Sequence, residues 1–404
     1  MGKTTQSGFH LSIIFIIVAV VALIGVIGWQ FMKHSGVNIV GKIAGGGFAS
    51  GYNCTDRDVK FTSPPLKMED LGYIRPLGAM LDGHVTPTDH VYVGPVKRDV
   101  PDNTYPVLMP ADGTVVEVGR MPEEYIGDRD FKGLAKEDHR IVISFSCRYF
   151  SIYIHVHKLE GEVAKQAAGL KPSENKQMSV DLKAGDVVGY IGGDTFDWTP
   201  LDTEKKLTGF IHPDNYKRES WKINTVSPFD LYTGTLKTQM EAKSWRTVAP
   251  IGGKIDYDQP GKLIGTWFRE GTGGYEGSNP QRYWDGHLSV VPDYIDPTYS
   301  IVSIGNWQDK AKQFVVNSKP NLAKISSADG FVKMEIRPIA YTSDDPTWNG
   351  SGMAKGIHPS FDQPVAGTIA FQVLAGEKLK VEKFVGKSAS EVTKFTGAAQ
   401  VYER

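Results

Sequence analysis

Cysteine is scarce in this chain, with only Cys54 and Cys147 among its 404 residues. The count allows at most one intramolecular disulfide, of the kind that persists in oxidising compartments outside the cytoplasm. If the two cysteines pair, they close a loop of about 93 residues, which contributes roughly 4–5 kcal/mol on the chain-entropy model. We expect a Cys54–Cys147 disulfide; two unpaired buried thiols are the alternative.

An excess of charge of either sign is lacking as well. Charged residues make up 23% of the chain and the formal net charge is −1, which argues against a nucleic-acid partner and an acidic tail. The 44 glycines and 23 prolines imply many turns, so we expect a mainly β protein. The length is sufficient for two domains with buried cores.

One long apolar run lies near the N-terminus. The stretch LSIIFIIVAVVALIGVIGW, Leu11 to Trp29, contains no charged residue. At about 1.5 Å per residue it is long enough to cross a hydrocarbon core of about 30 Å. We predict an uncleaved single-pass helix over residues 11–32 that holds the bulk of the chain outside the cytoplasm at the cell membrane. The alternative is a cleaved signal peptide, but FMKHSGVNIV lacks a small-x-small cleavage site.

Composition divides the rest of the chain into segments. A short segment, 1–10, precedes the predicted anchor, and residues 33–65 form a Gly/Ser-rich stalk that ends at TSPP. Period-2 alternation with Gly, Pro and Asp punctuation predicts a β-domain over 66–245 and a second all-β domain, sandwich or barrel, over 246–404. Short helices are expected in KLEGEVAKQAAGL and in SASEVTKFTG.

Two glycine-turn hairpins organise the first domain. In YPVLMPADGTVVEVG the turn is Pro110 to Gly113, and in VDLKAGDVVGYIGG it is Lys183 to Asp186, with YIHVH between the two hairpins. This order resembles the lysostaphin-like (LytM-type) zinc peptidases, whose small β-domain carries such a pair of hairpins, also called a duplicated hybrid motif. The resemblance covers about residues 78–215 and implies a hydrolase fold that acts on cell-wall peptides.

The resemblance also implies a metal site. Such peptidases bind zinc through an early H-x-x-x-D motif and a late H-x-H, and a Tyr-x-His element acts on the zinc-bound water. His84 and Asp89, in GHVTPTDH, match the early pair in order but with the spacing H-x4-D, and Tyr153-Ile154-His155 matches the middle element. The late H-x-H is missing after VVGYIGG. His155 is therefore the candidate catalytic residue, and His84 and Asp89 are candidate ligands of a zinc ion.

A catalytic zinc needs three protein ligands and an open position for water. The third ligand must come from His90, His155, His157 or His212. His155 and His157 are two residues apart, so on a regular strand both would point to one face. We expect His84, Asp89 and His155 to converge at one end of the domain, with His157 or His90 as a further ligand. The alternative is a polar turn in which Asp89 bonds the backbone.

Aromatic residues near these motifs are candidates to line a ligand groove, although aromatics at strand ends more often pack in the core or at its rim: Tyr92, Tyr153, Trp198, Phe210 and Trp221. In the second domain, Gly265-Thr266-Trp267 is similar to the G-x-W tripeptide of lipocalin-type barrels.

Two functions follow from these features. The first is a membrane-anchored envelope protein whose degenerate peptidase-like domain binds cell-wall peptidoglycan or a surface protein or peptide. The second is a zinc endopeptidase that cleaves peptidoglycan cross-bridges or surface peptides. The missing late H-x-H favours the first function, and the early pair with Tyr-x-His favours the second.

Overall fold

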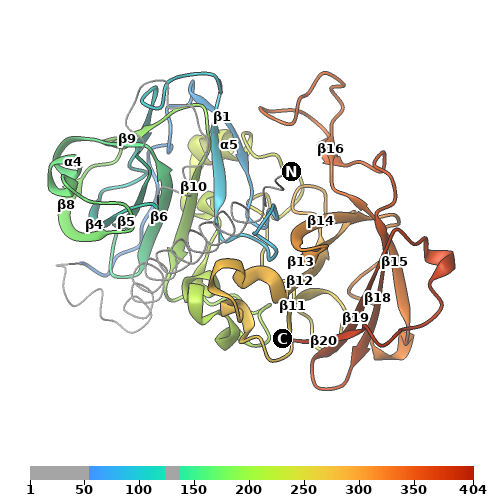
Figure 1. The fold of residues 1–404 in the computed structure, drawn as a ribbon. Coiled ribbons are helices and arrows are strands. Elements are labelled where there is room, and N and C mark those ends of the chain that lie inside the picture. Colours follow the sequence, from blue (N-terminus) through green and yellow to red (C-terminus); the bar gives the residue numbers. More distant parts are fainter. Residues whose placement is uncertain (1–53, 123–136) are drawn as a thin grey trace, which may run out of the picture.

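The computed structural model describes residues 54–122 and 137–404, which form two β units side by side (Figure 1). The first unit holds the strands coloured blue to green, and the second holds those coloured orange to red. A segment of short helices joins the two units. In this part of the chain the protein is mainly β.

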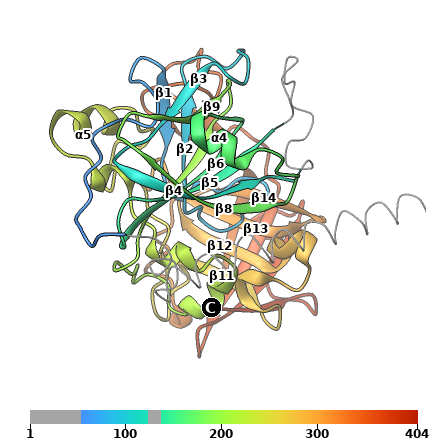
Figure 2. The ribbon, with the colours of Figure 1, turned by 90° about the vertical axis from the view of Figure 1, so that its left-hand side faces the viewer.

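A seven-stranded antiparallel sheet forms the body of the first unit, in the order β1-β2-β10-β6-β5-β4-β8. Its strands are β1 (Leu71–Arg75), β2 (Val91–Pro95), β4 (Gly113–Arg120), β5 (His139–Ser144), β6 (Tyr149–Val156), β8 (Asn175–Leu182) and β10 (Phe196–Asp202). A smaller sheet, β3-β9-β7, comprises β3 (Tyr105–Leu108), β7 (Lys158–Leu159) and β9 (Val187–Ile191). Figure 2 shows β3 and β9 together beside the larger sheet.

The two glycine-turn hairpins lie against each other. The Asp112 carboxylate of the first turn accepts hydrogen bonds from the Ala184 amide and the Lys183 ammonium of the second turn, both at 2.9 Å. Gly185 has a φ of +87°, a conformation in which glycine is favoured, and its amide donates to the Met109 carbonyl. The residues that predict the two turns therefore also bond the two hairpins to each other.

Helices are few and short in the described residues. The expected helix in KLEGEVAKQAAGL is α4 (Gly161–Ala167), with Val163 and Ala167 buried. The connecting segment contains the 3₁₀ helices η1 (Pro213–Asn224) and η2 (Pro228–Leu231) and the helix α5 (Gly234–Glu241). The helix expected in SASEVTKFTG is only a 3₁₀ turn, η6 (Ala389–Glu391), stabilised by a Ser388–Glu391 capping box.

The second unit is a closed antiparallel barrel in the order β11-β12-β13-β14-β15-β18-β19-β20. Its strands are β11 (Gly265–Arg269), β12 (His287–Pro292), β13 (Ser300–Trp307), β14 (Lys310–Val316), β15 (Val332–Pro338), β18 (Gly367–Leu374), β19 (Lys378–Val385) and β20 (Gln400–Glu403). Three 3₁₀ turns, η3 (Gly274–Glu276), η4 (Pro280–Gly286) and η5 (Ser327–Asp329), and a small hairpin, β16 (Tyr341–Thr342) with β17 (His358–Pro359), extend from it.

The G-x-W tripeptide lies on the first barrel strand. Trp267 is completely buried, and its indole N–H donates to the Leu263 carbonyl at 2.9 Å. The Arg404 guanidinium lies 3.9 Å from the centre of a Trp267 ring and donates to the Ile264 carbonyl at 2.6 Å. The end of the chain thus closes the barrel beside its first strand.

One hydrophobic cluster spans the junction of the two units, and the barrel interior has a separate core that includes Trp267 and Phe314. A single cluster extends from Phe61 and Trp198 in the first unit, through Phe210 and Tyr216 in the connecting segment, to Phe268 in the barrel. Tyr216 contacts Phe210 and Phe268 edge to face, at centroid distances of 4.7 and 5.5 Å. This continuity fixes the arrangement of the units, because separating them would expose aromatic surface to water.

The prediction of a single-pass membrane protein at the cell membrane is corrected. Within residues 54–122 and 137–404, no helix is long and apolar enough to cross a membrane. The predicted anchor, residues 11–32, lies outside the described residues. The end of the predicted stalk is packed rather than free, since Phe61 is buried among Phe145, Trp198 and Tyr232.

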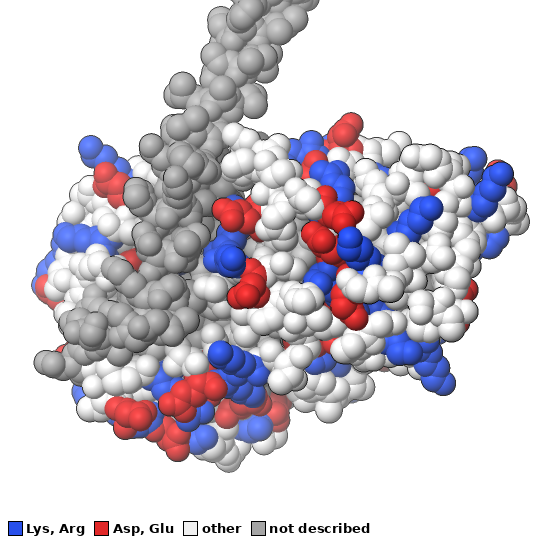
Figure 3. Space-filling model, turned by 90° about the horizontal axis from the view of Figure 1, so that it is seen from below, with Lys and Arg blue, Asp and Glu red and all other residues white. Residues whose placement is uncertain are grey.

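Charges of both signs lie close together on one face of the molecule. Seen from below, the described part of the molecule carries Lys and Arg interspersed with Asp and Glu (Figure 3). This mixture agrees with the formal net charge of −1.

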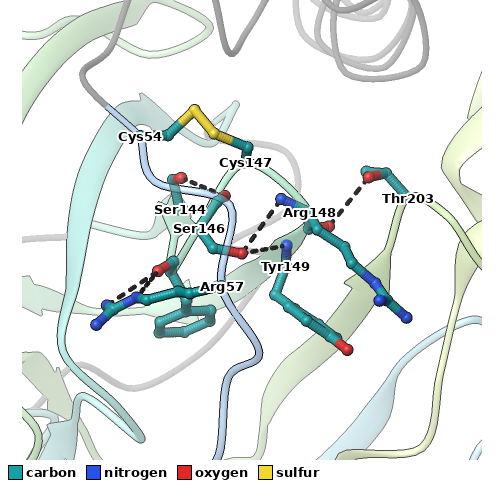
Figure 4. Close-up of a disulfide and its surroundings, with 9 residues drawn as sticks. Cys54, Arg57, Ser144, Ser146, Cys147, Arg148, Tyr149 and Thr203 are labelled. Carbon is teal, nitrogen blue, oxygen red and sulfur yellow. Dashed lines mark hydrogen bonds between the residues drawn. A yellow bond between two sulfur atoms is a disulfide. The ribbon is translucent and has the colours of Figure 1, made fainter.

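A disulfide joins Cys54 to Cys147, with a Cα–Cα distance of 5.1 Å (Figure 4). The Cys147 amide donates to the Thr55 carbonyl at 3.2 Å, and the Arg57 guanidinium donates to the Phe145 carbonyl at 3.1 Å. These contacts fasten the first described residues to the turn between β5 and β6.

Removing the disulfide should destabilise the protein. We expect the Cys54→Ala/Cys147→Ala double variant to lose up to about 4–5 kcal/mol of unfolding free energy, because the unfolded chain regains the entropy of a long loop. Chemical denaturation measures the loss. Reduced wild-type protein should unfold at the denaturant concentration of the double variant, and equal stability of oxidised and reduced protein would contradict the expectation.

Asp293 should make the barrel less stable as the pH rises. Its side chain is fully buried and accepts hydrogen bonds from the Ile295 and Asp296 amides and the Tyr341 hydroxyl. Burial outweighs these bonds and raises the pKa of Asp293 to about 6. The folded state therefore holds the proton more tightly, and its stabilising effect, full below about pH 4, is lost as the pH rises through about 6.

Asp293→Asn should remove this loss. Between pH 4 and 7 the unfolding free energy of the variant should fall by about 2–3 kcal/mol less than that of wild type. Tyr341→Phe should steepen the wild-type loss, because it removes a donor to the charged carboxylate. Identical pH profiles for all three proteins would refute the assignment.

Candidate functional site

The loop between β1 and β2 carries three of the predicted residues. His84 closes a tight turn, in which its amide donates to the Leu81 carbonyl at 2.8 Å, and Asp89 and His90 directly precede β2. The barrel supports this turn, because the Gln313 amide donates to the Asp82 carbonyl at 3.0 Å. Gly83 lies against the ring of Trp284, where an added Cβ would be 3.3 Å from the indole. The second unit therefore positions His84.

The central strand β10 brings two histidines of the first unit together. β10 pairs with β2 on one side and β6 on the other, so Asp197 lies opposite Tyr92 and Ile154. Its Oδ2 is 3.5 Å from His90 Nε2 and 3.7 Å from His155 Nε2. Asp197 thus connects the loop before β2 to the end of β6.

A β-bulge aims the His155 ring. The register between β5 and β6 shifts at this position, and His155 has a φ of +70°, a left-handed conformation that is costly for a residue with a Cβ. Its Nδ1 lies 2.7 Å from Oδ2 of Asp138, which is completely buried. This pairing leaves Nε2 directed at Asp197, and about a quarter of the side chain is exposed. Backbone strain of this kind is concentrated at functional sites.

Asp89 is bound by the connecting segment. The indole N–H of Trp221 donates to its Oδ2 at 2.5 Å, and the Lys222 ammonium lies 3.5 Å from its Oδ1. The Lys222 side chain is 3% exposed. It also lies 3.4 Å from the Glu219 carboxylate and 5.2 Å from the centre of the Tyr275 ring. Both Asp89 oxygens are therefore engaged by neighbours from one turn of η1.

These contacts form one continuous series, which we term the ionic chain. Carboxylates alternate with basic groups at successive distances of 3.4, 3.5, 3.2, 3.5, 3.7 and 2.7 Å. Its members in order are Glu219, Lys222, Asp89, His90, Asp197, His155 and Asp138. The alternation allows buried charges to compensate one another.

The pKa directions agree with this alternation. Burial opposes the charged form of each group, but Asp197 and Asp89 raise the pKa of His90, and Asp89 and Glu219 raise that of Lys222. Burial likewise disfavours the Asp89 carboxylate, yet Lys222 and His90 hold its pKa well below the usual range. Asp89 is therefore held in its ionised form, and the neighbouring carboxylates favour the charged forms of Lys222 and His90.

His84 lies beside the ionic chain. Its ring contacts that of His90 edge to face, at a centroid distance of 5.5 Å. The pKa of His84 is lowered, most by the loss of hydration among its neighbours and next by the nearby His90 and Lys222. Because His84 is an exposed residue, solvent limits the size of this shift. A neutral, accessible imidazole is thus presented next to charged groups.

The structure brings His84, Asp89, His90 and His155 into one cluster and places the other two histidines elsewhere. His157 is buried with its Nδ1 3.0 Å from the Asp102 carboxylate. The bulge at His155 breaks the alternation that would have pointed both histidines to one face. His212 is exposed at the start of η1.

The candidate aromatic groove is largely core. Tyr153, Trp198 and Phe210 are buried in the hydrophobic cluster. Trp221 and Tyr92 contact the histidine cluster instead, Trp221 through Asp89 and Tyr92 through His90, at a centroid distance of 4.8 Å.

Sequence reasoning missed four members of the ionic chain: Asp197, Asp138, Lys222 and Glu219. Asp197 lies in FDWTP, which two residues separate from the end of VVGYIGG, so an acidic residue stands in the strand searched for the late H-x-H. Asp138 precedes the β5 histidine by one residue. Lys222 had no local signal, because its partner Asp89 is 133 positions earlier and only the folded connecting segment joins them.

The residues fit zinc poorly as arranged. Among residues 54–122 and 137–404, no group of three histidine, cysteine, aspartate or glutamate side chains has a metal-binding arrangement. Zinc would have to displace the Trp221 N–H and the Lys222 ammonium from Asp89. Zinc binding by His84, Asp89, His90 and His157 remains a prediction from the sequence.

The strain at His155 gives a stability prediction. His155→Gly should be about 1 kcal/mol or more stable than His155→Ala, because glycine adopts a positive φ without penalty and both variants lack the imidazole. Thermal or chemical unfolding of the two variants measures the difference. At Cys147, where the structure gives no positive φ, alanine and glycine should not show this order. A His155→Ala protein at least as stable as His155→Gly would refute the strain.

Comparison with known proteins adds a weak similarity. No family model and no curated protein matches the chain. One similar solved structure is the "NMR solution structure of lysostaphin", at 10% identity over 78% of this chain and 80% of that one, with a TM-score of 0.20. Another is "The antimicrobial peptidase lysostaphin from Staphylococcus simulans", at 9% identity over 87% and 90%, with a TM-score of 0.20. The chain is thus weakly similar in structure to lysostaphin, and scores this low carry no argument about activity.

Proposed function

We propose that this protein binds a peptide-containing cell-wall ligand at the histidine cluster and does not hydrolyse it. The observation that carries the proposal is a pair of buried polar atoms, His90 Nε2 and Asp197 Oδ1. Neither has a hydrogen-bond partner within the described residues. Each such atom costs about 1–3 kcal/mol when left unsatisfied, and a donor beside an acceptor suits an amide group.

The surroundings of this pair support binding. His84 and His155 are partly exposed on either side of it, so a ligand can approach from solvent. The charged groups compensate one another within the ionic chain, which leaves hydrogen bonding as the means of recognition. The ligand class follows the resemblance of residues 78–215 to peptidases that act on cell-wall peptides.

A second candidate is the zinc endopeptidase. The observation that favours it is the bond between His155 Nδ1 and the buried Asp138 carboxylate, which fixes the ring and presents Nε2. Histidines that ligate metals or act as general bases are oriented in this way. The engagement of Asp89 by Lys222 and Trp221 weighs against this candidate.

Calorimetric titration of the full-length protein with soluble muropeptides tests the proposal. Wild type should bind, and Asp197→Asn should weaken binding at least tenfold, about 1.4 kcal/mol, because a neutral amide is a weaker hydrogen-bond acceptor than the carboxylate. Asp230→Asn is the matched control: this exposed carboxylate pairs only loosely with Lys205, at 3.8 Å, and its loss should leave affinity unchanged.

The same incubations distinguish the two candidates. New amino groups released from peptidoglycan with added zinc, and lost in His155→Ala, would establish the endopeptidase and overturn the binding-only function. Absence of both muropeptide binding and release would overturn both.

A further inference from the structure

We propose that the Lys222 ammonium is the resident cation of the histidine cluster, takes the place that a metal ion would need beside Asp89, and makes the site independent of metal. The inference concerns the site's own charges and holds whichever ligand the site binds.

The first argument is the direction from which Lys222 enters. The segment η1 is kinked at Glu219, which has the non-helical angles φ −129° and ψ 59°. Beyond the kink, Trp221 and Lys222 both reach Asp89, one at each carboxylate oxygen. The electron pairs that a metal would accept are therefore turned toward an indole N–H and an ammonium.

The second argument is burial. A lysine that is 3% exposed persists only where anions and aromatic surface replace its hydration. Lys222 has Asp89, Glu219 and the face of Tyr275 for this purpose. The Tyr275 hydroxyl in turn donates to Glu219 at 2.6 Å, so a barrel residue fixes the carboxylate that serves the lysine. The pocket for the ammonium is built by both units.

The third argument is electrostatic. A divalent ion at Asp89 would lie next to the Lys222 ammonium, which is 3.5 Å from Asp89 Oδ1, and the repulsion between cations is strong where solvent is excluded. Coordination would also require Asp89 to release its three present contacts. The site therefore disfavours a metal ion because of Lys222, a residue that is not among the candidate ligands.

Neutralising the lysine tests the inference. The variant Glu219→Gln/Lys222→Met removes the cation together with its second anion, so that the local charge stays balanced and Asp89 loses its contact with the ammonium. Metal-stripped proteins are titrated with Zn²⁺ by calorimetry, and thermal unfolding is followed with and without Zn²⁺. Wild type should show no stoichiometric Zn²⁺ binding in the micromolar range and no shift of Tm.

The double variant should bind Zn²⁺ at least tenfold more tightly than wild type and gain Tm on its addition. Adding His84→Ala to it should abolish the gain. Lys237→Met, which removes an exposed lysine of α5 paired with Glu241 at 3.7 Å, should behave as wild type. Should the double variant fail to fold, Lys222→Gln, which keeps a hydrogen-bond donor near Asp89, replaces it with the same expectation.

Stoichiometric micromolar Zn²⁺ binding by wild type would overturn the inference. A folded variant with no gain in Zn²⁺ affinity would overturn it too. These outcomes do not depend on muropeptide binding, so failure of the proposed function and failure of this inference are distinguishable.

Discussion

A carboxylate that is buried must be compensated where it lies, and for Asp89 this constraint shapes the centre of the molecule. Its compensation comes from His90 beside it in sequence and from Trp221 and Lys222 far along the chain. Removing one partner of a buried charge pair typically costs about 3–5 kcal/mol. The buried charge of Asp89 thus holds the connecting segment against the first unit, because separating them would leave this carboxylate without Trp221 and Lys222.

Because of this constraint, the site depends on contacts from both units and from the connecting segment. The first unit supplies the histidines, η1 supplies the cation, and the barrel supports both: Gln313 holds the turn of His84, and Tyr275 holds the anion that serves Lys222. The shared aromatic core around Tyr216 keeps the units in register. A change in the packing of the barrel would therefore alter the histidine cluster without touching a histidine.

Local features were predictable from the sequence, and long-range ones were not. The glycine turns, helix α4 and the strand-rich second unit follow from periodicity and turn residues, which act over a few positions. Lys222 and Asp197 belong to the site through strand order and the path of η1, which no short motif encodes. The +70° φ of His155 also escaped prediction, because a bulge depends on the partner strand's register. The prediction of a membrane span rested on a local feature alone, the apolar run near the N-terminus. It was wrong for the described residues, where no helix is long and apolar enough to cross a membrane.

The departures from the peptidase pattern have one physical consequence in common. In addition to the H-x4-D spacing, His90 directly follows Asp89, so a basic ring accompanies that carboxylate into the cluster. Asp197 stands on the strand where the pattern has histidines, and it faces His90 and His155. Lys222 is the cation beside Asp89 and Glu219. Each departure places a charged or basic group where a metal site would have a neutral donor or an open position. Together these groups alternate in sign closely enough to stabilise one another in a buried site.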